Sequence, residues 1–141
     1  MKKPWLKDWP WQTVVTINEG LRKEKHIPDK GASRRFEVAR RLWESARRNS
    51  LTFGQTLALC RKCHKLAPFS FYNGNTFAAI GRTMVQQIVR KAPPTKAHAI
   101  RSVVGHYIAG TIGPRELKKA LEDCNIETSR LKRINGARDR S

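Results

Sequence analysis

The pattern with the most chemical content is Cys60, Cys63 and His64, which occupy positions i, i+3 and i+4 of a predicted helix. Thiolates and an imidazole at this spacing could supply three of the four ligands of a tetrahedral zinc ion. The candidates for the fourth ligand are Cys124, His26, His98 and His106. Because no second close pair of ligands follows, we prefer two buried thiols and a histidine on an amphipathic helix, and we expect no cofactor.

A second pair of residues, His98 and His106, stands eight positions apart on one predicted helix. Two histidines can serve as general acid and base in phosphodiester cleavage if the fold brings them together. The middle of the chain has no paired carboxylates to hold Mg²⁺, no phosphate-cradling glycine loop and no nucleophile motif. We therefore expect a non-catalytic protein and keep a small metal- or histidine-dependent nuclease as an alternative.

The charge of the chain is strongly basic and unevenly distributed. Its 141 residues include 29 Lys and Arg against 11 Asp and Glu, which gives a net charge of +18 at pH 7. No acidic residue lies between Glu44 and Glu116. Protein surfaces normally mix both signs, and such an excess strains a compact state by self-repulsion. The composition predicts a partner that supplies negative charge, and nucleic acid is the leading candidate.

Phosphate contacts are expected from one outer helix and from the central helices. Arginines, and no lysine, occupy the polar side of residues 34–49, and an arginine binds phosphate through two parallel hydrogen bonds. The predicted phosphate-binding residues are Arg34, Arg40, Arg41, Arg47, Arg48, Arg61, Lys62, Lys65, Arg82, Arg90, Lys91, Lys96 and Arg101. Glu37 and Glu44 precede Arg41 and Arg48 by four positions, so ion pairs are expected to neutralise part of the outer helix.

Residues 69–77 interleave aromatic and amide side chains between two basic helices. Aromatic planes stack on bases and amides bond base edges, so Tyr72, Asn73 and Asn75 are candidate contacts for a single strand. The alternative is a helix-to-helix turn whose rings fill the end of the bundle. The pattern leaves both interpretations open.

Hydrophobic periodicity predicts an all-α single domain, a small bundle of about five helices. The expected helices cover residues 12–25, 34–49, 53–67, about 76–92 and 96–109, with a shorter helix from Pro114 and a last turn after Thr128 or Ser129. The predicted N-caps are Ser33, Thr52 in a capping box with Gln55, Asn75 or Thr76, and Thr95. The dipeptide Asn73-Gly74 predicts a tight turn.

The two ends differ from this helical domain, which we expect to span residues 12–134. Residues 1–11 hold three of the four tryptophans among prolines and predict an extended arm. We prefer docking of its indoles on the body or on a second copy of the chain, with base stacking by Trp5, Trp9 or Trp11 as the alternative. Residues 135–141 are expected to form a frayed tail.

The sequence also indicates a compartment. Pro4, Trp5 and Asp8 follow the first lysines where a secretory signal would need an apolar run, and no apolar stretch approaches the ~20 residues of a spanning helix. An odd count of three cysteines argues against a disulfide framework. We expect a cytoplasmic protein with no membrane partner.

Together these features predict a non-catalytic nucleic-acid-binding accessory subunit of a larger nucleoprotein complex, with RNA favoured over DNA. In size, charge and helical layout the chain resembles the small basic helical-bundle accessory proteins that partner reverse transcriptases in diversity-generating retroelements. The resemblance is one of composition, carries over no residue, and implies that partnership as one alternative. A subunit of a CRISPR-like complex and a ribosome-associated protein are others.

A DNA-binding regulator is a further alternative from a different class. The helices within residues 75–109 could form a helix-turn-helix. Pro93 and Pro94 would separate these helices stiffly, and only Lys96, His98 and Arg101 would face the DNA.

Overall fold

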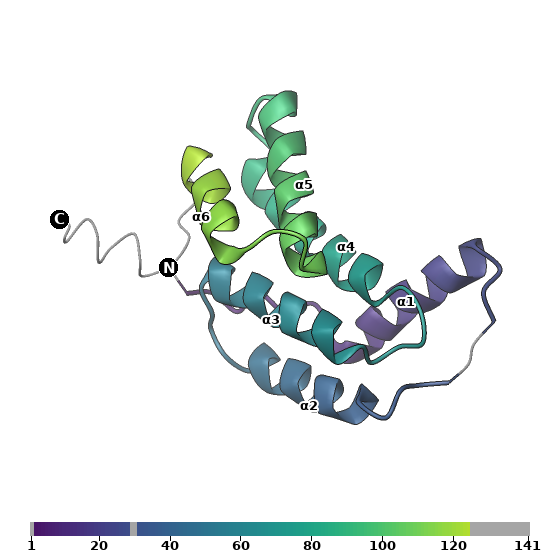
Figure 1. The fold of residues 1–141 in the computed structure, drawn as a ribbon. Helices are drawn as coiled ribbons and strands as arrows, with labels where there is room; N and C mark the ends of the chain where they lie inside the picture. Colours follow the sequence, from purple (N-terminus) through teal and green to yellow (C-terminus); the bar gives the residue numbers. More distant parts are fainter. Residues whose placement is uncertain (1, 29–30, 125–141) are drawn as a thin grey trace.

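The computed structural model describes residues 2–28 and 31–124, and within these ranges the chain forms six helices (Figure 1). They are α1 (Trp11–Glu24), α2 (Phe36–Arg47), α3 (Phe53–Leu66), α4 (Asn73–Val89), α5 (Pro94–Ala109) and α6 (Pro114–Asp123). The all-α prediction is confirmed, and α6 is the shorter helix that the sequence predicts from Pro114. The predicted turn after Thr128 or Ser129 and the tail 135–141 lie outside the described residues.

The central unit is the helix pair α4 and α5, which pack against each other more extensively than any other described helices (Figure 1). α3 packs on both of them, α6 on α5, α1 on α4, and α2 on α1 and α3. The close approach of α4 and α5 depends on Gly81, because a Cβ there would lie 2.3 Å from Ile108 Cδ1 in the core. None of the described helices combines the length and the apolar character needed to cross a membrane.

The N-terminal segment is held against α2 and the start of α3. Lys3 and Leu51 exchange two backbone hydrogen bonds of 2.8 Å in an antiparallel bridge. Leu6 is buried, and the Trp43 indole N–H donates to the Trp9 carbonyl at 2.7 Å. The predicted arm therefore packs on the body of the same chain.

Trp11, which the sequence places in that arm, is the first residue of α1 and belongs to the core. Its ring stacks on Phe69 with a centroid distance of 5.8 Å and an interplanar angle of 10°. Phe69 and Phe77 are both buried. The rings before and after the turn therefore fill the end of the bundle, which is one of the two interpretations open from the sequence.

The start of α3 follows its sequence prediction closely. The Gln55 N–H donates to Thr52 Oγ1 at 3.0 Å, and the Thr52 N–H donates to Gln55 Oε1 at 2.9 Å. This reciprocal pair is the capping box that the sequence predicts. It satisfies two N–H groups that would otherwise lack partners at the first turn.

Replacement of Thr52 by alanine is expected to lower the free energy of unfolding by about 1 kcal/mol, because one cap acceptor is lost. Urea denaturation of the purified protein measures this difference. Thr52→Ser keeps the hydroxyl and should retain most of the stability. Equal losses in the two variants would show that the capping hydroxyl contributes nothing.

Two predicted helix starts were wrong at the level of single residues. α2 begins at Phe36, because Ser33 Oγ accepts from the Arg35 N–H at 3.1 Å and forms a turn before the helix. α5 begins at Pro94 after Pro93 and is not capped by Thr95. A proline at the first position of a helix costs no hydrogen bond, since an N–H there would have no partner within the helix.

The Asn73-Gly74 prediction was also wrong, because α4 begins at Asn73 and both residues lie in its first turn. Tyr72 takes the left-handed conformation, with φ of 60°. The Asn73 amide then accepts from the Phe69 N–H at 2.9 Å and donates to the Phe69 carbonyl at 2.8 Å. This side chain closes the loop before the helix, so neither Asn75 nor Thr76 acts as the cap.

A buried polar contact fixes the start of α4 against α1. Asn18 Nδ2 donates to the Phe71 carbonyl at 2.7 Å and to Thr76 Oγ1 at 3.1 Å. Arg22 Nε donates to Asn18 Oδ1 at 3.2 Å. Because these groups are shielded from water, the contact sets the position of the first turn of α4.

Candidate nucleic-acid interface

The described carboxylates lie on the N-terminal segment and on α1, α2 and α6, and the three helices between α2 and α6 carry none. The ion pairs that the structure describes in residues 2–28 and 31–124 all involve Glu37 and Glu44 on α2. The helices α3, α4 and α5 contain no Asp or Glu. The predicted phosphate-binding residues on these helices and on the connection between α4 and α5 are exposed or half-buried: Arg61, Lys62, Lys65, Arg82, Arg90, Lys91, Lys96 and Arg101. We call the solvent-facing side of α3–α5 the acid-free surface.

Of the five predicted arginine contacts on and beside α2, Arg40, Arg41 and Arg47 already pair with a carboxylate of the chain, and Arg40 and Arg47 do so at short distance. Arg40 binds Glu37 at 2.7 Å, and its hydrogen bond holds the pKa of the Glu37 carboxyl below its ordinary value. Arg47 binds Glu44 at 2.7 Å and donates to the carbonyls of Leu6 and Lys7 at 3.1 and 2.9 Å. Arg47 therefore holds the N-terminal segment in place.

Glu44 pairs with Arg47 at i+3, whereas the sequence predicted Arg48 at i+4. Burial alone would raise the pKa of Glu44, but hydrogen bonds from the Trp11 N–H and from Arg47 bring the pKa below its ordinary value. Arg48 is thereby left exposed. Arg34 is exposed as well, and Arg41, also exposed, lies 3.9 Å from Glu37.

Two arginines of the acid-free surface contact neighbouring helices. The Arg61 guanidinium lies over the Tyr107 ring, 4.7 Å from its centroid, and links α3 to α5. Arg101 Nη1 donates to Gln86 Oε1 and links α5 to α4. In both pairs the partner is neutral, so it does not compensate the positive charge of the arginine.

The amides of the aromatic turn have different roles. Asn73 uses its oxygen and its nitrogen on the Phe69 backbone. Tyr72, half-buried, is the N-cap residue of α4. Asn75, the third residue of α4, is exposed and lines a pocket. Of the three predicted base contacts, Asn75 is the one that faces a cavity.

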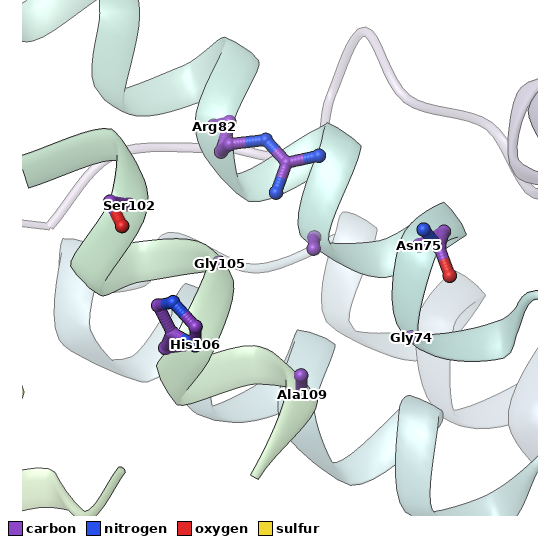
Figure 2. A pocket seen from close by; sticks show the side chains of 8 residues that line it. Gly74, Asn75, Arg82, Ser102, Gly105, His106 and Ala109 are labelled. Atoms are coloured by element: carbon purple, nitrogen blue, oxygen red, sulfur yellow. The ribbon is translucent and has the colours of Figure 1, made fainter. Parts of the chain in front are cut away.

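This pocket lies between the first half of α4 and the second half of α5 and has a volume of about 270 Å³ (Figure 2). Asn75 and Arg82 from α4 and Ser102 and His106 from α5 stand around it. Its remaining lining residues are small: Gly74, Ala78, Gly105 and Ala109. The antiparallel pairing of α4 and α5 brings these residues together from distant parts of the sequence.

Gly105 leaves room for the end of the Arg82 side chain. A Cβ on Gly105 would be 2.6 Å from Arg82 Nη1, closer than real Cβ atoms come to other heavy atoms. The guanidinium therefore lies directly on the α5 backbone at the one residue of that turn without a side chain. This packing places a permanent positive charge at the pocket.

His106 is oriented by Thr111. Thr111 Oγ1 donates its hydrogen to the His106 carbonyl at 3.1 Å, and the same oxygen lies 2.9 Å from His106 Nδ1. Because a hydroxyl has one hydrogen, Oγ1 must accept in the second contact, and Nδ1 must donate. The neutral ring then carries its free lone pair on Nε2, which becomes a second donor when the ring is protonated.

Cys60 and Cys63 are buried in the core, whereas Cys124 is half-buried. Burial raises the pKa of both core thiols, with a further contribution to Cys60 from Cys63, and the pKa of Cys63 reaches about 12. His64 packs against α4, since a Cβ on Gly74 would lie 3.1 Å from its Cε1. Within the described part of the chain, no three His, Cys, Asp or Glu side chains form a group that could hold a metal ion.

Sequence analysis missed Ser102, Gly105 and His106 as members of the candidate site. The available signal was a matched spacing of small residues, Gly74 with Ala78 and Gly105 with Ala109, each pair one helical turn apart. Two such turns can face each other closely only when the helices are antiparallel neighbours. Comparison of the chain with protein-family models, with curated proteins and with solved structures found no match.

Proposed function

We propose that this chain is a non-catalytic nucleic-acid-binding accessory subunit of a larger nucleoprotein complex, and that its acid-free surface neutralises phosphates. The observation that carries the proposal is the charge distribution. The carboxylates of α2 pair with its own arginines, whereas α3–α5 carry exposed cations with no carboxylate on any of the three helices. A polyanion supplies the missing charge and releases its counterions on binding.

RNA is the polymer that we favour. Beside Arg82, the pocket presents Asn75 and Ser102, which are neutral groups that both donate and accept hydrogen bonds. A ribose 2′-hydroxyl next to a phosphate is also both donor and acceptor, and it is the group by which proteins distinguish RNA from DNA. A cation flanked by such groups suits a ribonucleotide better than a bare phosphodiester chain.

The first test is fluorescence anisotropy with a short labelled single-stranded RNA and with DNA of the same sequence. If about six phosphates are contacted, affinity for a single strand should fall by about 300-fold between 50 and 200 mM salt, and RNA should bind more tightly than DNA. The labelled RNA should remain intact. Absence of binding at low salt, or equal competition by polyglutamate, would refute the nucleic-acid assignment, and RNA cleavage would refute the non-catalytic part.

The surface itself can be tested with two charge-matched variants. Lys62→Gln/Lys65→Gln/Lys91→Gln removes three exposed lysines at the acid-free surface. Its control, Lys7→Gln/Lys23→Gln/Lys25→Gln, removes three exposed lysines from the N-terminal segment and the end of α1. The first should reduce the salt slope by about two, at about 0.7 per phosphate contact on a single strand, and the control by less. Equal slopes would place the contacts elsewhere.

A further inference from the structure

The pocket between α4 and α5 combines four small residues with four polar side chains, one of which is a permanent cation. Its small residues offer no aromatic plane or branched side chain for a base or a hydrophobic ligand to pack on. Its polar groups are one guanidinium, one imidazole, one amide and one hydroxyl. The volume of about 270 Å³ is below the usual ~300–1,000 Å³ range of pockets for drug-sized molecules. These properties fit a phosphate with its adjoining sugar.

The polar groups around the pocket come from two helices. Arg82 is placed by its packing on Gly105, and His106 is placed by its contact with Thr111. Gly74 and Asn75 stand in the first turn of α4, where peptide N–H groups add partial positive charge. The acid-free surface around the pocket provides no carboxylate on α3–α5 to compete for Arg82.

We propose that this pocket binds one phosphate group, through Arg82 and His106, and that Gly105 is the residue that keeps the Arg82 guanidinium in place. The inference rests on the proposed function for its source of phosphate, which is the bound strand. The same chemistry could come from an internal phosphodiester, from a terminal 5′-phosphate or from a free mononucleotide. The experiment below distinguishes these sources.

A charge-neutral variant tests the pocket without altering the overall field of the protein. Gly105→Ala places a Cβ where Arg82 Nη1 now lies, so the flexible end of the arginine must move. The matched control is Gly20→Ala in α1, where a Cβ meets nothing within 4 Å. Both changes replace a helical glycine by alanine, which favours the helix. Neither variant should therefore melt at a lower temperature than the original protein.

Strand affinity should fall about tenfold in Gly105→Ala and in Arg82→Gln, which is the change expected from the loss of one charge-assisted hydrogen bond. Gly20→Ala should bind like the original protein. If Gly105→Ala melts at a lower temperature, Arg82→Gln decides alone, because this side chain is exposed. Original affinity in both pocket variants, while the original protein binds RNA, would overturn the pocket and leave the proposed function standing.

A second measurement tests phosphate binding in the pocket independently of strand binding by the acid-free surface. Titration of inorganic phosphate and of a 5′-mononucleotide should shift the His106 ring signals in NMR spectra, with the signals assigned by His106→Gln, and the shift should be reduced in Gly105→Ala. This outcome supports the pocket even if the protein binds no strand, whereas an unmoved His106 ring refutes it. Preference for a 5′-phosphorylated over a 5′-hydroxyl oligonucleotide identifies a terminal phosphate, and equal binding identifies an internal one.

Discussion

Replacement of Trp43 by alanine is expected to lower the free energy of unfolding by about 3–5 kcal/mol, the usual cost of truncating a large buried aromatic side chain. Trp43 is fully buried. Its ring lies 6.3 Å from Trp11 and 5.8 Å from Phe77, between centroids. The truncation leaves a cavity where α1, α2 and α4 meet, and it also removes the donor to the Trp9 carbonyl.

Denaturation in urea, followed by circular dichroism, measures this loss. Trp43→Phe is the informative companion, because it keeps a buried aromatic ring and removes the indole N–H with a smaller part of the buried area. We expect it to lose clearly less stability than Trp43→Ala. A Trp43→Ala protein as stable as the original would contradict the position of this indole in the core.

The second large effect concerns the reactivity of Cys60 and Cys63. The thiolate is the reactive form of cysteine, and burial raises the pKa of both thiols, that of Cys63 to about 12. At about pH 8 an alkylating reagent should therefore modify these two cysteines roughly a thousandfold more slowly in the folded protein than in the urea-unfolded chain. Timed alkylation followed by mass spectrometry of the peptides gives the rates. Fast labelling of the folded protein, or stoichiometric zinc in it, would contradict two neutral buried thiols.

The same burial predicts that stability falls at alkaline pH. In the unfolded chain these thiols release their protons near pH 9.0, whereas Cys63 in the folded protein keeps its proton up to about pH 12. Above pH 9 the unfolded state binds fewer protons, so the free energy of unfolding decreases by about 1.4 kcal/mol per pH unit for each thiol. Below pH 9 this stabilisation is fully present.

The control for this pH effect is the double variant Cys60→Ala/Cys63→Ala. Its cavities should make it less stable at neutral pH, but its stability should decline less steeply between about pH 9 and 12. Other groups that titrate at alkaline pH are common to both proteins and cancel in the comparison. Parallel curves would show that the thiols do not contribute.

The helices were predictable wherever the signal is local. An apolar stripe at helical spacing specifies a helix almost regardless of what it packs on, and the Thr52–Gln55 box needs only four consecutive residues. The start of α4 was not predictable in this way. Asn73 joins the helix because its amide reaches back to Phe69 and because Tyr72 takes a left-handed conformation, and both depend on packing that no dipeptide preference contains.

The basic candidate surface was likewise visible in the sequence only as charge. Composition cannot show that Arg47 is bonded to the carbonyls of Leu6 and Lys7 while Arg48 is exposed. The pocket escaped prediction for a related reason. Arg82 and Gly105 are separated by the whole connection between α4 and α5, and their contact follows from how deeply the two helices approach each other at Gly81.

The contacts of the N-terminal segment also bear on how the protein is made. Lys3 with Leu51, Trp9 with Trp43 and Leu6 with Arg47 all join partners within the first fifty-one residues, so these contacts can form before the rest of the chain has left the ribosome. The ring partners Phe69 and Phe77 are synthesised later. Until they emerge, Trp11 and Trp43 have only each other and Phe36 as ring partners. A nascent chain that ends before residue 69 therefore leaves part of both indoles uncovered.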